Sequence, residues 1–278
     1  MKQRVISAIV AALIVIPLLV IGGIPFIVGI ALLAAIGLWE ILRLKDKETP
    51  YPIIVKIISF ICLELFVLNK FEGDFINTGI NYLPVAISAL ALLIPSVFYK
   101  KEQYSTKDAF NLLGAVTLIG LFFNSLIVLY NTQIGIGPDA VKGIWLLLYL
   151  FIIAACTDTF AMLIGCLIGK HKLIPAVSPK KSVEGSIAGS FMGTAIGTLY
   201  YINIIGNLVL WKVIVMSLIL TVFGQIGDLF FSKIKREHDI KDFSNIMPGH
   251  GGILDRLDSF SFILLGYIII ITIFNFIR

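Results

Sequence analysis

Long apolar stretches divide the chain, and they limit the folds that it can adopt. Each approaches the roughly 20 mostly apolar residues that a helix needs to cross a bilayer. Only 14% of the 278 residues are charged, against about 25% in an ordinary soluble domain. We therefore predict an all-α, polytopic integral membrane protein with about nine transmembrane helices. The predicted spans are residues 5–22, 24–42, 51–68, 82–99, 109–130, 143–169, 186–205, 211–231 and 259–277.

The first apolar stretch follows Lys2 and Arg4 and could be a signal peptide. A second apolar stretch follows almost at once, and no soluble domain appears after it, so we interpret the first as a retained span.

Basic residues indicate the orientation, because cytoplasmic loops of membrane proteins collect Lys and Arg. With the N-terminus inside, seventeen of the 22 basic residues fall in cytoplasmic segments and four fall outside. We predict a cytoplasmic N-terminus and a multi-pass protein of a bacterial plasma membrane. The net charge of +5 then reflects anionic lipid headgroups, and no nucleic-acid module is visible.

Polar residues are distributed unevenly along the chain. Residues 1–142 form five plain N-terminal spans, in which Glu64 could be functional or could reach the interface. Residues 143–278 form four spans with two long cytoplasmic connections, 170–185 and 232–258. We expect this second region to be catalytic, with its site facing the cytoplasm.

Two aspartates lie within predicted spans, where insertion of an aspartate costs roughly 2.5–3.5 kcal/mol. Asp158, near the middle of its span, could line a polar cavity or could make a hydrogen bond between helices. Asp228 lies near the cytoplasmic end of its span, where it could bind a cation or simply reach the interface.

The connection at 170–185 contains a Ser178-Pro179 pair that interrupts any helix. The lysines that follow could bind phosphate, or they could serve only as an orientation signal.

The connection at 232–258 combines cationic side chains, glycines and carboxylates. Asp255 and Asp258 are three residues apart, so both would lie on one helical face and could share a divalent cation. Arg256 could bind a phosphate or pair with a carboxylate. Such groups occur together where Mg²⁺ meets a nucleoside triphosphate, because Mg²⁺ is held by carboxylates and substrate phosphates.

Two segments carry a family resemblance. The run S-K-I-K-R-x4-K-D, followed by P-G-H-G-G-I-L-D-R-L-D, resembles the signature of phosphatidate cytidylyltransferases, also called CDP-diacylglycerol synthases. Met247 departs from the usual Leu, Ile or Phe. The segment SPKKSVEG at 178–185 is similar to S-P-K-K-T-x-E-G of the same family, and Asp158 falls where the family has an aspartate. The resemblance covers residues 143–278.

The resemblance implies transfer of CMP from CTP to phosphatidic acid in the membrane, by a homodimer. It also implies Mg²⁺ together with a second cation, either divalent or monovalent such as K⁺. Our metal ligands are Asp228, Asp255 and Asp258. The other candidate catalytic residues are Lys235, Arg236, Lys241, His250 and Arg256. The candidate substrate-binding residues are Asp158, Ser178, Lys181, Glu184, Ser232, Gly251 and Gly252. His250 could bind a phosphate or the cytosine, or could brace the glycine turn.

Three other functions remain open from the residues. A secondary transporter would also carry carboxylates within its spans. A lipid kinase or another lipid nucleotidyltransferase would share the metal and phosphate chemistry. A purely structural membrane protein would need none of these groups.

Overall fold

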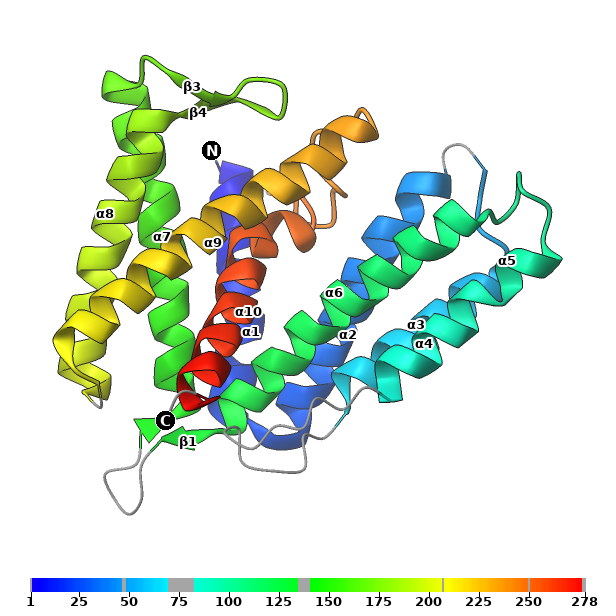
Figure 1. The fold of residues 1–278 in the computed structure, drawn as a ribbon, viewed down its shortest axis with the longest axis horizontal. Coiled ribbons are helices and arrows are strands. Elements are labelled where there is room, and N and C mark those ends of the chain that lie inside the picture. Colours follow the sequence, from blue (N-terminus) through cyan, green and yellow to red (C-terminus); the bar gives the residue numbers. More distant parts are fainter. Residues whose placement is uncertain are drawn as a thin grey trace. The chain divides into compact units, whose positions relative to one another are not determined.

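The structure is a computed structural model that describes residues 2–46, 49–69, 83–134, 141–206, 208–249 and 251–276, and these are mostly helical (Figure 1). Five helices in the described part are long and apolar enough to cross a membrane, in agreement with the predicted class. They are α2 (Gly23–Asp46), α6 (Thr106–Asn131), α7 (Gly143–Ile168), α9 (Leu210–Glu237) and α10 (Leu254–Phe276). The total of nine spans and the orientation stay predictions.

The remaining predicted spans are also occupied by helices. These are α1 (Lys2–Ile21), α3 (Ile53–Val67), α4 (Leu83–Leu93) with α5 (Pro95–Phe98), and α8 (Val183–Tyr200) with the π-helical turn η1 (Tyr201–Ile205). The predicted span 82–99 is interrupted because Pro95 has no N–H to continue the ladder of α4.

The chain forms two compact units, which we describe separately. The first unit comprises Met1–Val128 and Asp242–Asp255, and the second comprises Leu129–Lys241 and Arg256–Arg278. The segment 242–255 therefore packs with the early helices, although it lies late in the sequence. The predicted division at residues 142 and 143 stays a prediction.

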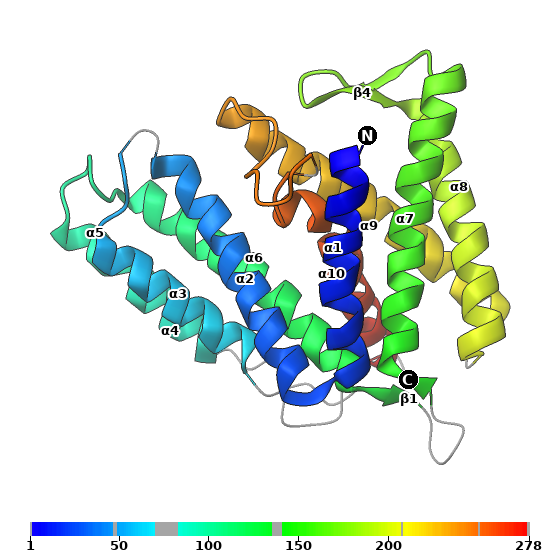
Figure 2. The ribbon, with the colours of Figure 1, turned by 180° about the vertical axis from the view of Figure 1, so that it is seen from behind.

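In the first unit, α2, α3, α4 and α6 lie side by side (Figures 1 and 2). Leu38, Leu63 and Phe123 are fully buried among them. The approach of α6 to α3 is close, since a Cβ at Gly120 would lie 2.8 Å from Cγ of Phe66. Tyr104, which precedes α6, donates a hydrogen bond of 2.8 Å to the carbonyl oxygen of Leu92. This bond connects the start of α6 to α4.

In the second unit, α8 packs against α7 along a line of glycines. These four buried residues are Gly185, Gly189, Gly193 and Gly197. A Cβ at Gly189 would lie 2.9 Å from Cβ of Ala161 on α7, so the two backbones approach closely only because the side chain is absent. Helix α9 contacts both α7 and α8.

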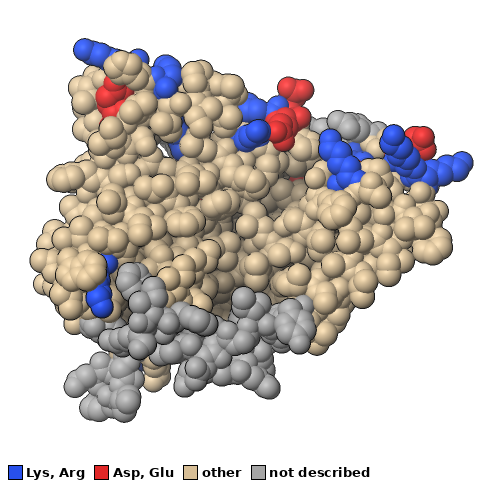
Figure 3. All heavy atoms as spheres, in the orientation of Figure 1, with Lys and Arg blue, Asp and Glu red and all other residues tan. Residues whose placement is uncertain are grey.

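Two short antiparallel hairpins accompany the helices of this predominantly helical fold. One pairs β1 (Gln133–Ile134) with β2 (Val141–Lys142), and the other pairs β3 (Lys172–Ile174) with β4 (Ser178–Ser182). The second hairpin connects the end of α7 to the start of α8. Figure 3 shows Lys and Arg side chains over this hairpin, which contains Lys172, Lys180 and Lys181.

Candidate active site

Three carboxylates in the second unit interact with one another. Asp158 lies on α7, Asp228 on α9 and Asp258 on α10. Both Asp158 and Asp258 experience the charge of Asp228, and Asp258 also experiences the charge of Asp158. Aspartates far apart in the sequence therefore come together on three helices. Their mutual repulsion must be offset by cationic groups.

Two lysines supply positive charge beside these carboxylates. Lys181 of β4 forms an ion pair with Asp228, so the hairpin reaches across to α9. Lys235, on the last turns of α9, is buried, and its positive charge interacts favourably with the carboxylate of Asp258. Ser232 Oγ, one turn after Asp228, donates a hydrogen bond of 3.2 Å to Oδ1 of this aspartate. The two predicted connections thus contribute to one cluster.

Asp158 makes the interhelical hydrogen bond that was one of its two alternatives. Ser259 Oγ on α10 donates to Oδ2 of Asp158 over 2.9 Å, and this hydrogen bond is partly buried. Asp258 accepts a hydrogen bond of 2.8 Å from the backbone N–H of Ser259. Asp158 and Asp258 are therefore linked through the same short stretch of α10.

Glu184, at the start of α8, fixes the base of the hairpin. Its carboxylate accepts hydrogen bonds from the backbone N–H groups of Lys170 and His171, and lies 2.6 Å from Nδ1 of His171. The backbone N–H of Glu184, followed by the His171 ring, stabilises the ionised form and lowers the pKa of Glu184 to about 2. Glu184 therefore holds together the loop that carries Lys181.

The other candidates of the second unit lie around the hairpin and the end of α9. Arg236 donates to the carbonyl oxygens of Val177 and Ile240, over 3.4 and 3.3 Å, and ties the end of α9 to the hairpin loop. Ser178 is half-buried within β4. Lys241 and Arg256 are exposed.

In the first unit, Asp255 braces the loop that precedes α10. Its Oδ2 accepts hydrogen bonds from the backbone N–H groups of Phe243, over 2.8 Å, and Gly252, over 2.9 Å. Gly251 has a φ of 85°, and a Cβ there would lie 2.8 Å from Oδ2 of Asp255. The predicted helical turn is present, since α10 begins at Leu254. His250 lies outside the described residues.

One buried carboxylate was missed by the sequence prediction. Glu40 of α2 is fully buried and accepts hydrogen bonds from Ser244, Ile253 and Leu254 in the same loop. The sequence did place Glu40 inside the predicted span 24–42. An acidic residue is costly to insert in a membrane, so its presence there indicates a specific role.

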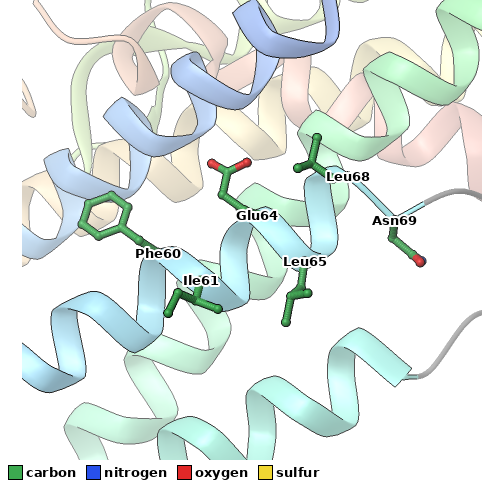
Figure 4. Close-up of a pocket in the computed structure, with 6 residues that line it drawn as sticks. All are labelled: Phe60, Ile61, Glu64, Leu65, Leu68 and Asn69. Carbon is green, nitrogen blue, oxygen red and sulfur yellow. The ribbon is translucent and has the colours of Figure 1, made fainter. Parts of the chain in front are cut away.

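Glu64 lines a pocket of about 590 Å³ in the first unit (Figure 4). The other lining residues are Phe60, Ile61, Leu65, Leu68 and Asn69. Figure 4 shows the carboxylate projecting from α3 on the side away from Leu65. Within the described residues, the carboxylate of Glu64 accepts no hydrogen bond, and the pocket offers mainly apolar contacts.

The acidic cluster fits a hard cation by the chemistry of its donors. Asp158, Asp228 and Asp258 offer only carboxylate oxygens, the ligands that Mg²⁺ prefers. No group of three or more His, Cys, Asp or Glu side chains stands ready to hold an ion in the part of the chain that the structure describes. In the arrangement seen, Lys181 takes the place beside Asp228 that a cation would need.

Comparison with known proteins gives a consistent result over nearly the whole chain. Residues 2–274 match the cytidylyltransferase family. A phosphatidate cytidylyltransferase from Staphylococcus saprophyticus is 35% identical over 264 residues, which cover 95% of this chain and 96% of the relative. A phosphatidate cytidylyltransferase from Bacillus subtilis is 32% identical over 265 residues, covering 95% of each chain.

Proposed function

The chain belongs to the cytidylyltransferase family, and on this premise we propose that it transfers CMP from CTP to phosphatidic acid. The products are CDP-diacylglycerol and pyrophosphate. The structural observation that supports this most directly is the pairing of Lys181 with Asp228 beside Asp258. It places a cation from the hairpin among carboxylates from two membrane helices.

The reaction needs charge neutralisation more than it needs a base. The phosphate monoester of phosphatidic acid has a second pKa of about 6, so it is largely ionised at neutral pH. One of its oxygens attacks the α-phosphorus of CTP, and the bond to the departing pyrophosphate breaks. The protein must therefore hold two anionic substrates in line and stabilise the charge on the leaving group.

Asp228 and Asp258 would hold the cation at this site. When bound, Mg²⁺ supplies neutralisation of the triphosphate and stabilisation of the leaving pyrophosphate. A second divalent cation, or a monovalent one such as K⁺, would occupy the same centre. Asp255 is the third proposed ligand, although two backbone N–H groups already engage its Oδ2.

Basic side chains would bind the phosphates. Lys181, which pairs with Asp228 in this structure, would contact a phosphate oxygen of CTP when Asp228 serves as a ligand. Lys235 is buried beside Asp258 and would act close to the metal. Arg236, Lys241 and Arg256 are exposed and suited to meet CTP from water.

The remaining proposals concern the setting of the enzyme. The chain would cross a bacterial plasma membrane nine times with its N-terminus in the cytoplasm, and the site would face the cytoplasm, from which CTP comes. Phosphatidic acid would enter from the leaflet between helices. The enzyme would act as a homodimer. His250, Ser178, Ser232, Gly251 and Gly252 would complete the substrate contacts.

The test is an assay of the purified protein with Mg²⁺, phosphatidic acid and labelled CTP. Label from the α-phosphate should enter the lipid, whereas label from the γ-phosphate in lipid would identify a kinase. We expect Asp258→Asn to reduce turnover at least ~100-fold, a loss of about 2.7 kcal/mol of transition-state stabilisation. The matched control is Asp239→Asn, in the exposed turn after α9, where φ is 51° and Asn is tolerated. Wild-type turnover in Asp258→Asn would remove this residue from the site.

A further inference from the structure

Glu40, a carboxylate inside a predicted span, accepts three hydrogen bonds from described residues. Its side chain is 0% exposed. Oε1 accepts from Ser244 Oγ over 2.6 Å and from the backbone N–H of Ile253 over 2.9 Å. Oε2 accepts from the backbone N–H of Leu254 over 2.9 Å. All four residues belong to the first unit.

The two backbone donors are located where a helix begins. Leu254 is the first residue of α10 and Ile253 precedes it, so their N–H groups have no partner within the helix. Glu40 satisfies both from a different helix, and its negative charge is favourable at the positive end of the α10 dipole. A buried carboxylate is retained in an apolar helix because these donors replace water.

Two carboxylates together satisfy three consecutive backbone N–H groups of the loop. Asp255 accepts from Gly252, and Glu40 accepts from Ile253 and Leu254. The loop carrying Asp255 is thereby held from two sides. Removing either carboxylate would leave buried N–H groups without an acceptor, which costs more than the loss of an average hydrogen bond.

The same contact explains one glycine of the family signature. A Cβ at Gly252 would lie 2.6 Å from Cδ of Glu40, which is too close for any other residue. A Cβ at Gly37, one turn before Glu40, would lie 3.3 Å from Cδ2 of Leu254, so α2 also approaches the start of α10 closely there. Gly252 is needed for the approach of Glu40, independently of any contact with a substrate.

We propose that Glu40 is a positioning residue for nucleotidyl transfer. It fixes the loop 242–255, and with it Asp255, in the conformation used by the reaction. This inference rests on the proposed function for its effect on turnover, whereas its effect on the loop can be measured without any substrate.

The experiment compares Glu40→Gln with Glu64→Gln in the full-length protein in detergent. Both changes remove one negative charge from a helix of the first unit, but of these two glutamates only Glu40 accepts hydrogen bonds from described residues of the loop. Gln has one acceptor oxygen and turns an NH₂ donor toward another donor. Two quantities are measured: hydrogen exchange of the amides in 242–255, and the kcat and KM for CMP transfer.

We expect exchange at Ile253 and Leu254 to accelerate at least ~10-fold in Glu40→Gln, because a charge-assisted acceptor is lost. We expect kcat to fall about 30-fold while KM for CTP changes less than about threefold, because misplaced groups lose orientation in the transition state. Ser244→Ala should reduce kcat by about threefold, because both backbone contacts persist. Glu64→Gln should match the wild type in exchange and turnover.

Several results would overturn the proposal. Wild-type exchange and turnover in Glu40→Gln would do so, as would equal acceleration throughout the first unit, which indicates general destabilisation. If Glu40→Gln does not fold, Ser244→Ala decides, and wild-type behaviour in both measurements overturns the proposal. A wild-type protein that transfers no CMP contradicts the proposed function instead, while accelerated exchange in Glu40→Gln still supports the role of Glu40 in the loop.

Discussion

Replacing Lys181 by Met tests the link between the hairpin and the carboxylate cluster. Methionine preserves most of the length and apolar volume of the side chain but removes its charge. Asp228 would then lose its ion-pair partner, and the incoming triphosphate would lose one cationic contact. The change should therefore weaken both the resting site and the transition state.

The magnitude follows from the contact that Lys181 would make with a phosphate oxygen of CTP at the place where it now pairs with Asp228. Two unit charges at about 4 Å interact by about 4 kcal/mol at an effective dielectric constant of 20. The side chains of Lys181 and Asp228 are 26% and 24% exposed. Solvent reduces the value at such a partly exposed site, so we take about 2 kcal/mol. This corresponds to a fall of about 30-fold in kcat/KM for CTP.

The assay is transfer of α-labelled CMP to phosphatidic acid in detergent micelles. Lys172→Met is the matched control, because Lys172 is exposed on β3 of the same hairpin. We expect less than a twofold change there, as for an ordinary exposed charge.

A double-mutant cycle adds Asp228→Asn. Because the two residues interact directly, the combined loss should be smaller than the sum of the single losses by about 1 kcal/mol or more. The reasoning is refuted if Lys181→Met stays within threefold of the wild type, or if the two losses add within error.

A pair of glycine substitutions tests helix packing, and a pH titration tests the ionisation of Glu184. Gly193→Ala on α8 should lower the free energy of unfolding by about 1–3 kcal/mol through overpacking, because a Cβ there would lie 2.9 Å from Cγ2 of Thr221. Both variants are measured by thermal unfolding. A Cβ at Gly114 would meet no atom within 4 Å, so Gly114→Ala should leave the free energy of unfolding unchanged or raise it slightly. The Glu184 carboxyl should titrate at about 2 rather than 4.5 in carbon NMR spectra. Because its folded pKa is lowered, its stabilisation of the hairpin is complete above 4.5 and is lost as the pH falls toward 2. Titration at 4.5 would contradict the contacts of Glu184 with His171.

Much of the helical framework was predictable from hydropathy. Burial in a membrane requires long apolar helices, so every predicted span contains a helix. The break before Pro95 could also have been anticipated, since proline cannot donate to the helix ladder. The β3–β4 hairpin was not predicted, because five residues around a Ser-Pro pair carry too little alternation to indicate a strand.

The sequence pointed to charged residues of the candidate site but not to their contacts. Asp158, Asp228 and Asp258 were identifiable as charges inside or beside apolar spans, and the structure brings them together. The contact of Glu40 with Ile253 joins residues 213 positions apart, and no local pattern encodes such a pairing. Similarly, the sequence showed that Lys181 was basic but not that Asp228 would be its partner.

The return of residues 242–255 to the early helices restricts how the chain can be recombined. A hybrid that exchanges its first 128 residues for those of a relative would separate Glu40 from the loop whose N–H groups donate hydrogen bonds to it. Exchanging the 14-residue segment 242–255 together with those helices would keep Glu40 and its hydrogen-bond donors from the same parent. An active hybrid between relatives should therefore need three junctions: one after residue 128 and one at each end of the segment 242–255.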